Sequence, residues 1–258
     1  MTQNEYLPAA VWQPSSPTGG RFSSINRPTS GSQFQRDLPR GSRPIQLYSM
    51  ATPNGVKVVI LLEELIALGI DDAKYDAHLI DIFAGDQFAS GFVEINPNSK
   101  IPALVEVSSG ASIFESGAIL LHLAERFGNF IAEGQQRIEC LSWLFWQVAS
   151  APYVGGGFGH FYVYAPSKMQ YPIDRFAMEV KRQLHLLDQH LSSRQFICGE
   201  QYTIADMAIW PWYGAIVLDH MYDAAEFLDA PSYPNLMRWA REIEARPAVQ
   251  IATGVLKS

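Results

Sequence analysis

The stretch 96-NPNSKIPALVEVSSGASIFESGAILLHLAERFG-128 combines a Lys-Ile-Pro sequence, two short strand-like runs and an apolar helix. ALVEV (103–107) and ASIFE (111–115) are predicted strands, and the Ser-Ser-Gly between them is a hairpin signal. A predicted helix begins at Ser116 and ends before Gly128, a residue type common just past a helix end. The stretch therefore predicts a hairpin that leads directly into a helix.

Upstream of this stretch, the sequence alternates between strand-like and helix-like segments. IQLYS (45–49) and KYDAHLI (74–80) have the composition of strands. Between them, TPNGVKVVILLEELIALG (52–69) predicts a helix, with Thr52 as its N-cap, a proline at its first position and a glycine past its end. The helix is apolar on most faces, which indicates burial on two sides. Residues 45–131 therefore predict a small α/β domain in the order βαβ, hairpin, α.

After a short polar linker near 129–136, residues 135–250 are predicted to be entirely helical. The apolar stripe of one of these helices, taken as core packing, consists of Phe176, Val180, Leu184, Leu187 and Leu191. Pro211 is expected to kink a later helix. Thr203-Ile-Ala-Asp206 has the form of a capping box, so Asp206 is interpreted as a helix cap rather than as a catalytic acid.

GGGFGHFYVY (155–164) is rich in glycine but is not expected to bind phosphate. It lacks the Gly-Lys-Ser/Thr sequence of a phosphate loop and follows no predicted strand. The segment instead indicates a break in a helix, with aromatic side chains available to wall a substrate pocket. His160 is interpreted as structural, because no partner base or nucleophile is identifiable nearby.

Residues 1–44 differ in composition from the rest of the chain. They hold six of the sixteen prolines, with many serines and glycines, and show no apolar period. Such a segment cannot build its own core, so it is either a disordered tail or an arm that lies on the folded body. Its aromatic residues favour the arm: Tyr6, Trp12, Phe22 and Phe34.

The composition limits the classes of function. The chain has 258 residues, a formal net charge of −7 and a pI of about 5.3, which argues against nucleic acid as the main partner, since phosphate binding needs a basic face. No apolar run is long enough to span a membrane, and the first residues lack the features of a signal peptide. Cys140 and Cys198 are predicted to be buried free thiols, and no cysteine or histidine spacing indicates a metal site. A cytoplasmic location is therefore expected.

With these segments in place, the chain resembles the glutathione transferase superfamily over nearly all of residues 45–250. The motifs that carry the resemblance are a strand followed by TPNG and a helix, NPNSKIPAL, FESGAILLHLAE and YTIADMAIWPW. INRP (25–28), GDQFASGFVEINPNSKIPAL and APYVGGGFGHFYVYAPSK make it similar in particular to the bacterial YghU-like (Nu-class) disulfide-bond oxidoreductases. The resemblance implies a thioredoxin-like α/β N-terminal domain, an all-α C-terminal domain, an extended N-terminal arm and a homodimer.

Glutathione is the ligand that this resemblance implies. The resemblance also implies a cis peptide at Ile101–Pro102, which would let the Ile101 backbone pair with an extended peptide; an ordinary trans proline at a strand start is the alternative. A carboxylate suits the first N–H groups of the helix at Ser116, and Glu115 suits an ammonium, although Ser116 could be only the N-cap. Lys100 is a candidate to meet the glycine carboxylate.

The thiol of glutathione is expected beside Thr52 and Asn54, at the start of the first helix. Partial positive charge at the helix start, the Thr52 hydroxyl and the Asn54 amide would together lower the pKa of the thiol. A shift of two units needs ~2.7 kcal/mol. Because the chain has no cysteine here, catalysis is assigned to bound glutathione, and Thr52 could serve as a helix cap with or without that role.

The resemblance adds three contacts and one departure from the family pattern. Gln87 and, from the arm, Asn26 are expected to touch the ligand. Arg175 is expected to face a second glutathione, because members of this family are expected to hold two glutathiones, or one oxidised molecule, per site. Where a glutamine is expected after Phe-Trp-x, Gln147 is followed by Val148, so the glutamine stands one place early.

Two functions from different classes fit these residues. The first is an enzyme, a glutathione-dependent disulfide reductase with some peroxidase or transferase side activity. The second is a non-catalytic glutathione-binding module used for regulation, as in the fungal nitrogen-regulator relatives. A transferase that acts on aromatic electrophiles is a third interpretation.

Overall fold

The βαβ order predicted for the first domain is present. The computed structural model describes residues 7–13 and 19–257. In it, β1 (Ile45–Ser49) and β2 (Tyr75–Leu79) are parallel neighbours joined by α1 (Pro53–Ala67). Helix α1 begins after the predicted N-cap, and its side chains are buried on most faces, as its apolar sequence predicts.

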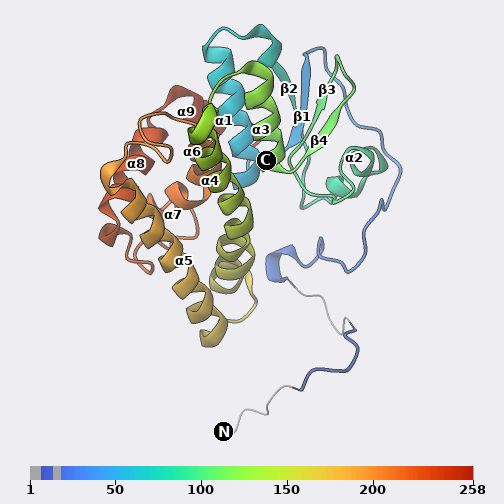
Figure 1. Cartoon of the computed structure of the whole chain (residues 1–258). Helices are drawn as coiled ribbons and strands as arrows, with labels where there is room; N and C mark the ends of the chain where they lie inside the picture. The colour runs from blue at the N-terminus through green and yellow to red at the C-terminus, as the bar shows by residue number, and fades with distance from the viewer. Residues whose placement is uncertain (1–6, 14–18, 258) are drawn as a thin grey trace, which may run out of the picture.

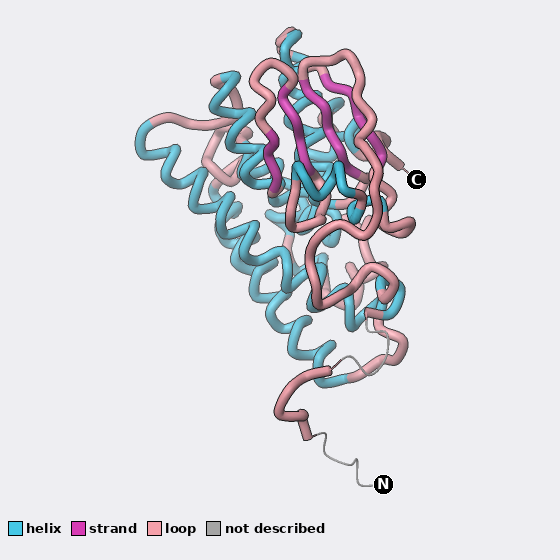
Figure 2. Tube along the Cα trace, turned by 90° about the vertical axis from the view of Figure 1, so that its right-hand side faces the viewer, coloured by secondary structure: helices cyan, strands magenta, loops and turns pink. Residues whose placement is uncertain are grey.

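The predicted hairpin completes a four-stranded mixed sheet in the order β2-β1-β3-β4. Strand β3 (Ala103–Glu106) is antiparallel to both β1 and β4 (Ser112–Phe114). Helix α3 (Ser116–Phe127) follows β4 directly and ends at Gly128, whose left-handed φ of +63° costs glycine little. Helices α1 and α3 lie on one side of the sheet and the short α2 (Ser90–Ile95) on the other (Figure 1), and Figure 2 shows the strands side by side. This arrangement confirms the thioredoxin-like domain.

The second half of the described chain is helical, as predicted. Its α-helices are α4 (Gly134–Pro152), α5 (Gln170–His190), α6 (Ile204–Ile209), α7 (Ala215–Val217), α8 (Pro234–Glu244) and α9 (Pro247–Ala252). The apolar stripe of α5 packs into the core, and α9 returns to contact α1 of the first domain. Pro211 lies where α6 widens into the π-helical turn Trp210–Gly214. No helix within the described residues is long and apolar enough to cross a membrane.

The glycine-rich segment is helical, so the expected helix break is wrong. Tyr153–Tyr164 continues α4 as a π-helix, whose turns are wider than those of an α-helix. A Cβ on Gly157 would lie 2.3 Å from the Phe176 ring, and one on Gly159 would lie 2.4 Å from the Tyr222 ring. These glycines are therefore needed for the close approach of aromatic rings, not for ending a helix.

The start of α6 carries the predicted capping box. The Asp206 carboxylate accepts hydrogen bonds from the backbone N–H groups of Thr203 and Ile197 and from Trp239 Nε1, each at 2.9 Å. Asp206 is fully buried, which raises the pKa of its carboxyl to about 6 despite these donors. The residue therefore ties three separate segments together inside the helical domain.

Asp206→Asn is expected to lower the free energy of unfolding by roughly 2–4 kcal/mol, because an amide cannot accept from all the buried donors that the carboxylate satisfies. Urea denaturation measures this change. Asp72→Asn, at an exposed position before β2, is the matched control and should change stability by less than about 0.5 kcal/mol. A loss for Asp206→Asn as small as that of the control would contradict the structural role.

Residues 19–44 lie along the folded body, so this part of the segment is an arm. The Phe22 ring stacks on Phe83 with 5.5 Å between centroids and meets the Tyr164 ring edge-on at 4.7 Å. The arm thus contacts both domains through one aromatic side chain. Tyr6 lies outside the described residues.

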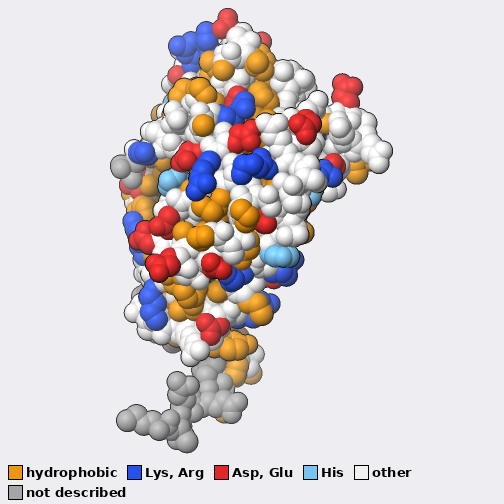
Figure 3. Space-filling model, turned by 90° about the vertical axis from the view of Figure 1, so that its left-hand side faces the viewer, with side chains coloured by type: hydrophobic (Ala, Val, Ile, Leu, Met, Phe, Trp, Pro, Cys, Tyr) orange, Lys and Arg blue, Asp and Glu red, His pale blue; other side chains and the backbone are white. Residues whose placement is uncertain are grey.

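The face of the molecule on the side of α8 carries basic and acidic side chains next to one another (Figure 3). Arg238 pairs with Glu242 at 3.3 Å, and Arg194 pairs with Glu139 at 2.7 Å. Exposed pairs of this kind contribute little to stability, about 0–1 kcal/mol each. On this face the two signs of charge are interspersed.

Candidate functional site

A cavity of about 690 Å³ opens between the two domains and the arm. Its position follows from strand order: Tyr48 pairs with Ala103 and Ala103 with Phe114, so the end of β1, the start of β3 and the end of β4 share one edge of the sheet. The loops at that edge supply seven of the nine residues predicted for the ligand site: Thr52, Asn54, Gln87, Lys100, Ile101, Glu115 and Ser116.

The start of α3 presents backbone donors to this cavity. Ser116 is the first helical residue and Glu115 occupies the N-cap position, so the alternative in which Ser116 is only an N-cap is wrong. No side chain caps the helix, which leaves its first N–H groups available to an anion. Glu115 has φ +69° and ψ 119°, a conformation that costs a residue with a side chain of order 1–3 kcal/mol.

The start of α1 faces the same cavity. Thr52 caps this helix through a long hydrogen bond, in which Oγ1 accepts from the Gly55 N–H at 3.4 Å. Trp212 Nε1 donates to Asn54 Oδ1 at 2.9 Å, so the oxygen of this amide is occupied and its nitrogen is the group left for a ligand. Trp212 therefore orients Asn54 from the helical domain, a role that the sequence did not indicate.

The turn before β3 contains the implied cis peptide between Ile101 and Pro102, and the trans alternative is wrong. The β3 ladder begins at Ala103, so Ile101 precedes it and stands outside the sheet. Asn96 Nδ2 donates to the Lys100 carbonyl, which fixes the turn from behind. The Ile101 backbone is thereby held at the edge of the cavity.

Lys57, which the sequence analysis did not single out, lies behind Ser116. Its Nζ donates to Gln147 Oε1 at 2.7 Å and to Ser116 Oγ at 3.3 Å. Burial lowers the pKa of Lys57 to about 7, and the charge of Glu115 acts in the opposite direction. The sequence does contain a signal for this residue: Lys57 is the only charged residue in the apolar run VKVVILL (56–62), which would have indicated a buried lysine. Because Gln147 is hydrogen-bonded to Lys57, it does not line the cavity. Val148, at the position where the family pattern has a glutamine, lines the cavity instead.

Several buried polar atoms near the cavity lack partners. Of the four such side-chain atoms among the described residues, three belong to residues at or next to the cavity: Gln87 Oε1, Ser99 Oγ and Gln147 Nε2. Buried polar groups without partners are uncommon, because each costs about 1–3 kcal/mol. Gln87 and Ser99 therefore have hydrogen-bonding capacity that a polar ligand in the cavity can use.

Two predicted residues lie away from the cavity. Asn26 is exposed, and the arm contributes Phe22 and Ile25 to the cavity wall instead. Arg175 is exposed on α5 and lines a separate hollow beside the first turn of that helix. The positions of both depend on how the arm and α5 pack on the rest of the chain, which motif spacing does not specify.

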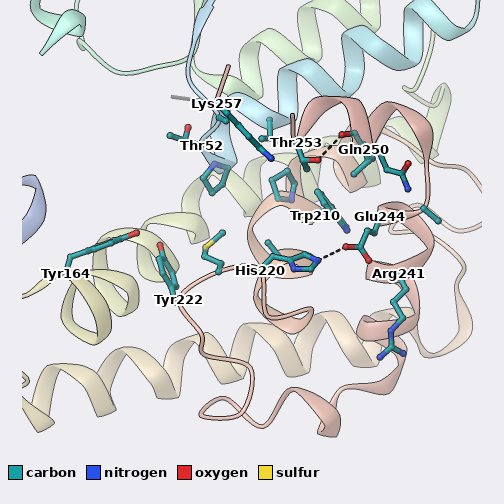
Figure 4. Close-up of a pocket in the computed structure, with 18 residues that line it drawn as sticks. Thr52, Tyr164, Trp210, His220, Tyr222, Arg241, Glu244, Gln250, Thr253 and Lys257 are labelled. Carbon is teal, nitrogen blue, oxygen red and sulfur yellow. Dashed lines mark hydrogen bonds and ion pairs between the residues drawn. The ribbon is translucent and has the colours of Figure 1, made fainter. Parts of the chain in front are cut away.

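A second cavity, of about 870 Å³, also has Thr52 in its wall, and Figure 4 shows the side chains that line it. It shares Thr52, Pro53, Tyr164 and Tyr222 with the first cavity. The Tyr164 and Tyr222 rings stand next to each other, and burial raises the pKa of both hydroxyls. On the opposite wall His220 Nε2 lies 2.5 Å from Glu244 Oε1. Thr52 therefore lies in the walls of both cavities.

Other candidate groups lie outside both cavities. The His160 ring packs edge-on against Phe161 and is not among the residues that line either cavity. Cys140 and Cys198 are buried free thiols, as predicted. Within the part of the chain that the structure describes, no cluster of three or more His, Cys, Asp or Glu side chains is arranged to hold a metal ion.

Comparison with known proteins agrees with this geometry. Residues 43–125 match the glutathione S-transferase N-terminal domain and residues 170–242 match the C-terminal domain. The disulfide-bond oxidoreductase YghU of Escherichia coli K12 is 57% identical over 253 residues, which are 97% of this chain and 88% of that protein.

Solved structures show the same likeness. Glutathione transferase YghU from Streptococcus pneumoniae, complexed with glutathione, has a TM-score of 0.95 and 52% identity, over 98% of this chain and 99% of the other. A glutathione transferase from Pseudomonas putida, with one glutathione disulfide bound per subunit, has a TM-score of 0.76 and 36% identity, over 84% and 94% of the two chains. The domain matches, the identity and the shared fold together show that the chain belongs to the glutathione S-transferase family.

Proposed function

We propose that the protein is an enzyme that reduces disulfides with the thiol of bound glutathione, with peroxidase activity as a side reaction. The observation that carries the proposal is one cavity in which the uncapped start of α3, with Glu115, and the start of α1, with Thr52, both form the wall. The relatives named as a disulfide-bond oxidoreductase and as glutathione complexes support the same chemistry.

Glutathione fits this cavity in an extended form. Its α-carboxylate takes the N–H groups at the start of α3 and the Ser116 hydroxyl, and its ammonium pairs with Glu115. The middle residue pairs with the Ile101 backbone, as an added strand would. Lys100 meets the glycine carboxylate, and the unpartnered Gln87 Oε1 accepts from a ligand N–H. This pose places the thiol at the start of α1.

The thiol reacts at Thr52 and Asn54. Their two donors and the positive end of α1 favour the thiolate, which is the nucleophile. The thiolate attacks one sulfur of the substrate disulfide, whose S–S bond breaks; the other sulfur leaves and takes up a proton. A second glutathione attacks the resulting mixed disulfide, so that two thiols become glutathione disulfide and the substrate is released as two thiols. The site then holds two glutathiones, or one oxidised molecule, in the course of turnover.

The second cavity is the place for the substrate disulfide. It meets the first at Thr52, so a substrate bound there reaches the sulfur without displacing glutathione. Its wall mixes aromatic and aliphatic groups with His220, Arg241 and Lys257, which suits a substrate that carries both apolar and polar parts. Neither Asn26 nor Arg175 is needed for this arrangement.

A coupled assay tests the proposed function. Hydroxyethyl disulfide and glutathione, with glutathione reductase and NADPH to recycle the oxidised product, should give sustained turnover, and chlorodinitrobenzene should give far less. Calorimetry with glutathione should show binding. Tight binding without turnover would favour the regulatory module, and high activity on chlorodinitrobenzene alone would favour an electrophile transferase.

The proposal includes a Nu-class homodimer that forms through the outer face of α4. Ile138, Phe145 and Val148 are exposed on this helix at spacings of seven and three residues, and Phe145 is 62% exposed. Large apolar side chains gathered on one helix face indicate a protein contact. Because Val148 also lines the glutathione cavity, this interface would adjoin the site.

Phe145→Glu is expected to convert the dimer to a monomer, because it places a charge in the proposed apolar interface. Sedimentation equilibrium measures the mass of the assembly. Leu68→Glu, at an exposed apolar position after α1, is the matched control and should leave the dimer intact. A dimer that persists in Phe145→Glu at low protein concentration would place the interface elsewhere.

A cytoplasmic location completes the proposal. Both cysteines are free thiols in the structure, and free thiols persist in reducing compartments. Disulfide reduction by glutathione also needs a compartment in which most glutathione is reduced.

A further inference from the structure

Beneath the glutathione cavity lies a buried lysine that the proposed chemistry does not use. Lys57 is 1% exposed, and the partners of its Nζ, Ser116 Oγ and Gln147 Oε1, are both neutral oxygens. A buried ammonium without a carboxylate partner is costly, and one way to meet that cost is a negative charge that arrives with a ligand. Lys57 itself contributes to the cavity wall.

The contacts of Lys57 point toward the expected carboxylate. Because Ser116 Oγ accepts from the Lys57 ammonium, its own hydroxyl proton is left to donate elsewhere. Ser116 is the first residue of α3, so this donor stands next to the free N–H groups of the helix start. An α-carboxylate at that point would receive the helix N–H groups and the Ser116 hydroxyl, with the lysine directly behind them.

We propose that Lys57 is a positioning residue for the ligand's α-carboxylate, and that its amine takes up a proton from solvent when that carboxylate binds. The inference rests on the proposed glutathione site. It assigns Lys57 no part in the thiol chemistry, because its contacts lie at the Ser116 end of the cavity.

Few charged groups near Lys57 are available to set its protonation state, so a bound carboxylate would have a large effect on it. Glu115 is the acidic group whose charge acts on it, and burial holds the pKa of Lys57 near 7. The other charged groups on α1, α3, α4, α6 and β3 have their own partners: Glu63 with Tyr75, Glu64 with Arg246, Glu106 with His122 and Arg126, Glu125 with Arg137, Glu139 with Arg194, and Asp206 with the Thr203 backbone. Asp72, before β2, is exposed. Lys100, also in the cavity wall, is exposed.

The sign of the pH dependence follows by linkage. A carboxylate beside Lys57 favours the ammonium, so it raises the pKa of that group in the complex. The complex then binds more protons than the free protein at pH values above about 7, and the affinity for the ligand falls as pH rises through that range.

Calorimetry with S-methylglutathione tests the inference, because this ligand keeps the α-carboxylate but has no thiol to ionise. Titrations at pH 7.5 in phosphate and in Tris, whose ionisation enthalpies differ, measure the protons taken up on binding. The wild-type protein should take up roughly half a proton or more per bound ligand, with an upper limit of about 0.75, the share of Lys57 that is neutral at pH 7.5 before the ligand binds. Its affinity should fall between pH 6 and pH 8.

Variants distinguish the contribution of Lys57 to binding and proton uptake from that of other residues in the cavity. Lys57→Met should bind about tenfold more weakly at pH 6, with no proton uptake and no slope in affinity with pH. Lys57→Gln, which keeps a donor without the charge, gives the same readout if the methionine variant does not fold. Lys100→Met removes a positive charge from the exposed wall, so it should weaken binding but keep the proton uptake.

Three outcomes would overturn the inference. Wild-type binding without proton uptake, or uptake that persists in a folded Lys57 variant, would remove Lys57 from the carboxylate subsite and leave the glutathione site standing. Absence of any binding heat with the wild-type protein, in either buffer and with glutathione as well, would overturn the glutathione site and the inference together.

Discussion

Thr52→Ala is expected to lower disulfide turnover by roughly 10–100-fold while it lowers the free energy of unfolding by only about 1 kcal/mol or less. In the proposed site the Thr52 hydroxyl donates to the thiolate, and a hydrogen bond to a charged group contributes about 1.5–3 kcal/mol. Its other role, the cap of α1, depends on a bond of 3.4 Å to the Gly55 N–H, so the stability cost falls at the low end for N-cap replacements.

The coupled disulfide assay measures this effect, and the pH–rate profile locates it. If the hydroxyl lowers the thiol pKa, the rising limb of the profile should move to higher pH in Thr52→Ala. Thr52→Ser is the matched control, because it keeps both the hydroxyl and the cap, and it should retain turnover within a few-fold. An unchanged rate and profile in Thr52→Ala would remove Thr52 from the mechanism.

Most of the first domain could be predicted because its signals are local. Thr52 caps the start of α1, and Gly69 and Gly128 take left-handed conformations just after α1 and α3. Both signals depend only on residues close in the sequence. The strand order then brings three loops to one sheet edge, so motifs distant in sequence meet at one cavity. For this reason seven predicted residues line the same cavity, although the sequence alone does not show how close together they lie.

The remaining features depend on tertiary packing, which a local pattern does not contain. Lys57 looked like an ordinary helix residue until α3 and α4 placed Ser116 and Gln147 against it. Trp212 reaches Asn54 from the other domain. In the sequence, the glycines of 155–164 indicate a helix break because glycine is a poor helix former. The reason for their presence, aromatic rings that pack against them, comes from distant parts of the chain and is not visible in the local sequence.

At Glu115, stability and binding are expected to change in opposite directions. The residue adopts φ +69° and ψ 119°, which is unfavourable for a residue with a side chain and less unfavourable for glycine, which has no Cβ to clash. In the proposed site, this residue holds its carboxylate at the start of α3, beside the expected ammonium of the ligand, which would give a functional reason for keeping a strained residue there. Glu115→Gly should therefore relieve strain and remove the ion pair at the same time.

Glu115→Gly is expected to raise the free energy of unfolding by about 1 kcal/mol, since relief of 1–3 kcal/mol of strain is partly offset by the backbone entropy of glycine. The affinity for glutathione should fall at least tenfold, because the ammonium loses its partner. Glu115→Gln isolates the two effects: it keeps the strained backbone, so it should lose affinity without gaining stability. Urea denaturation and calorimetry measure the two quantities on the same samples. A less stable Glu115→Gly would show that the backbone there is not strained, and full affinity in Glu115→Gln would show that the carboxylate does not meet the ligand.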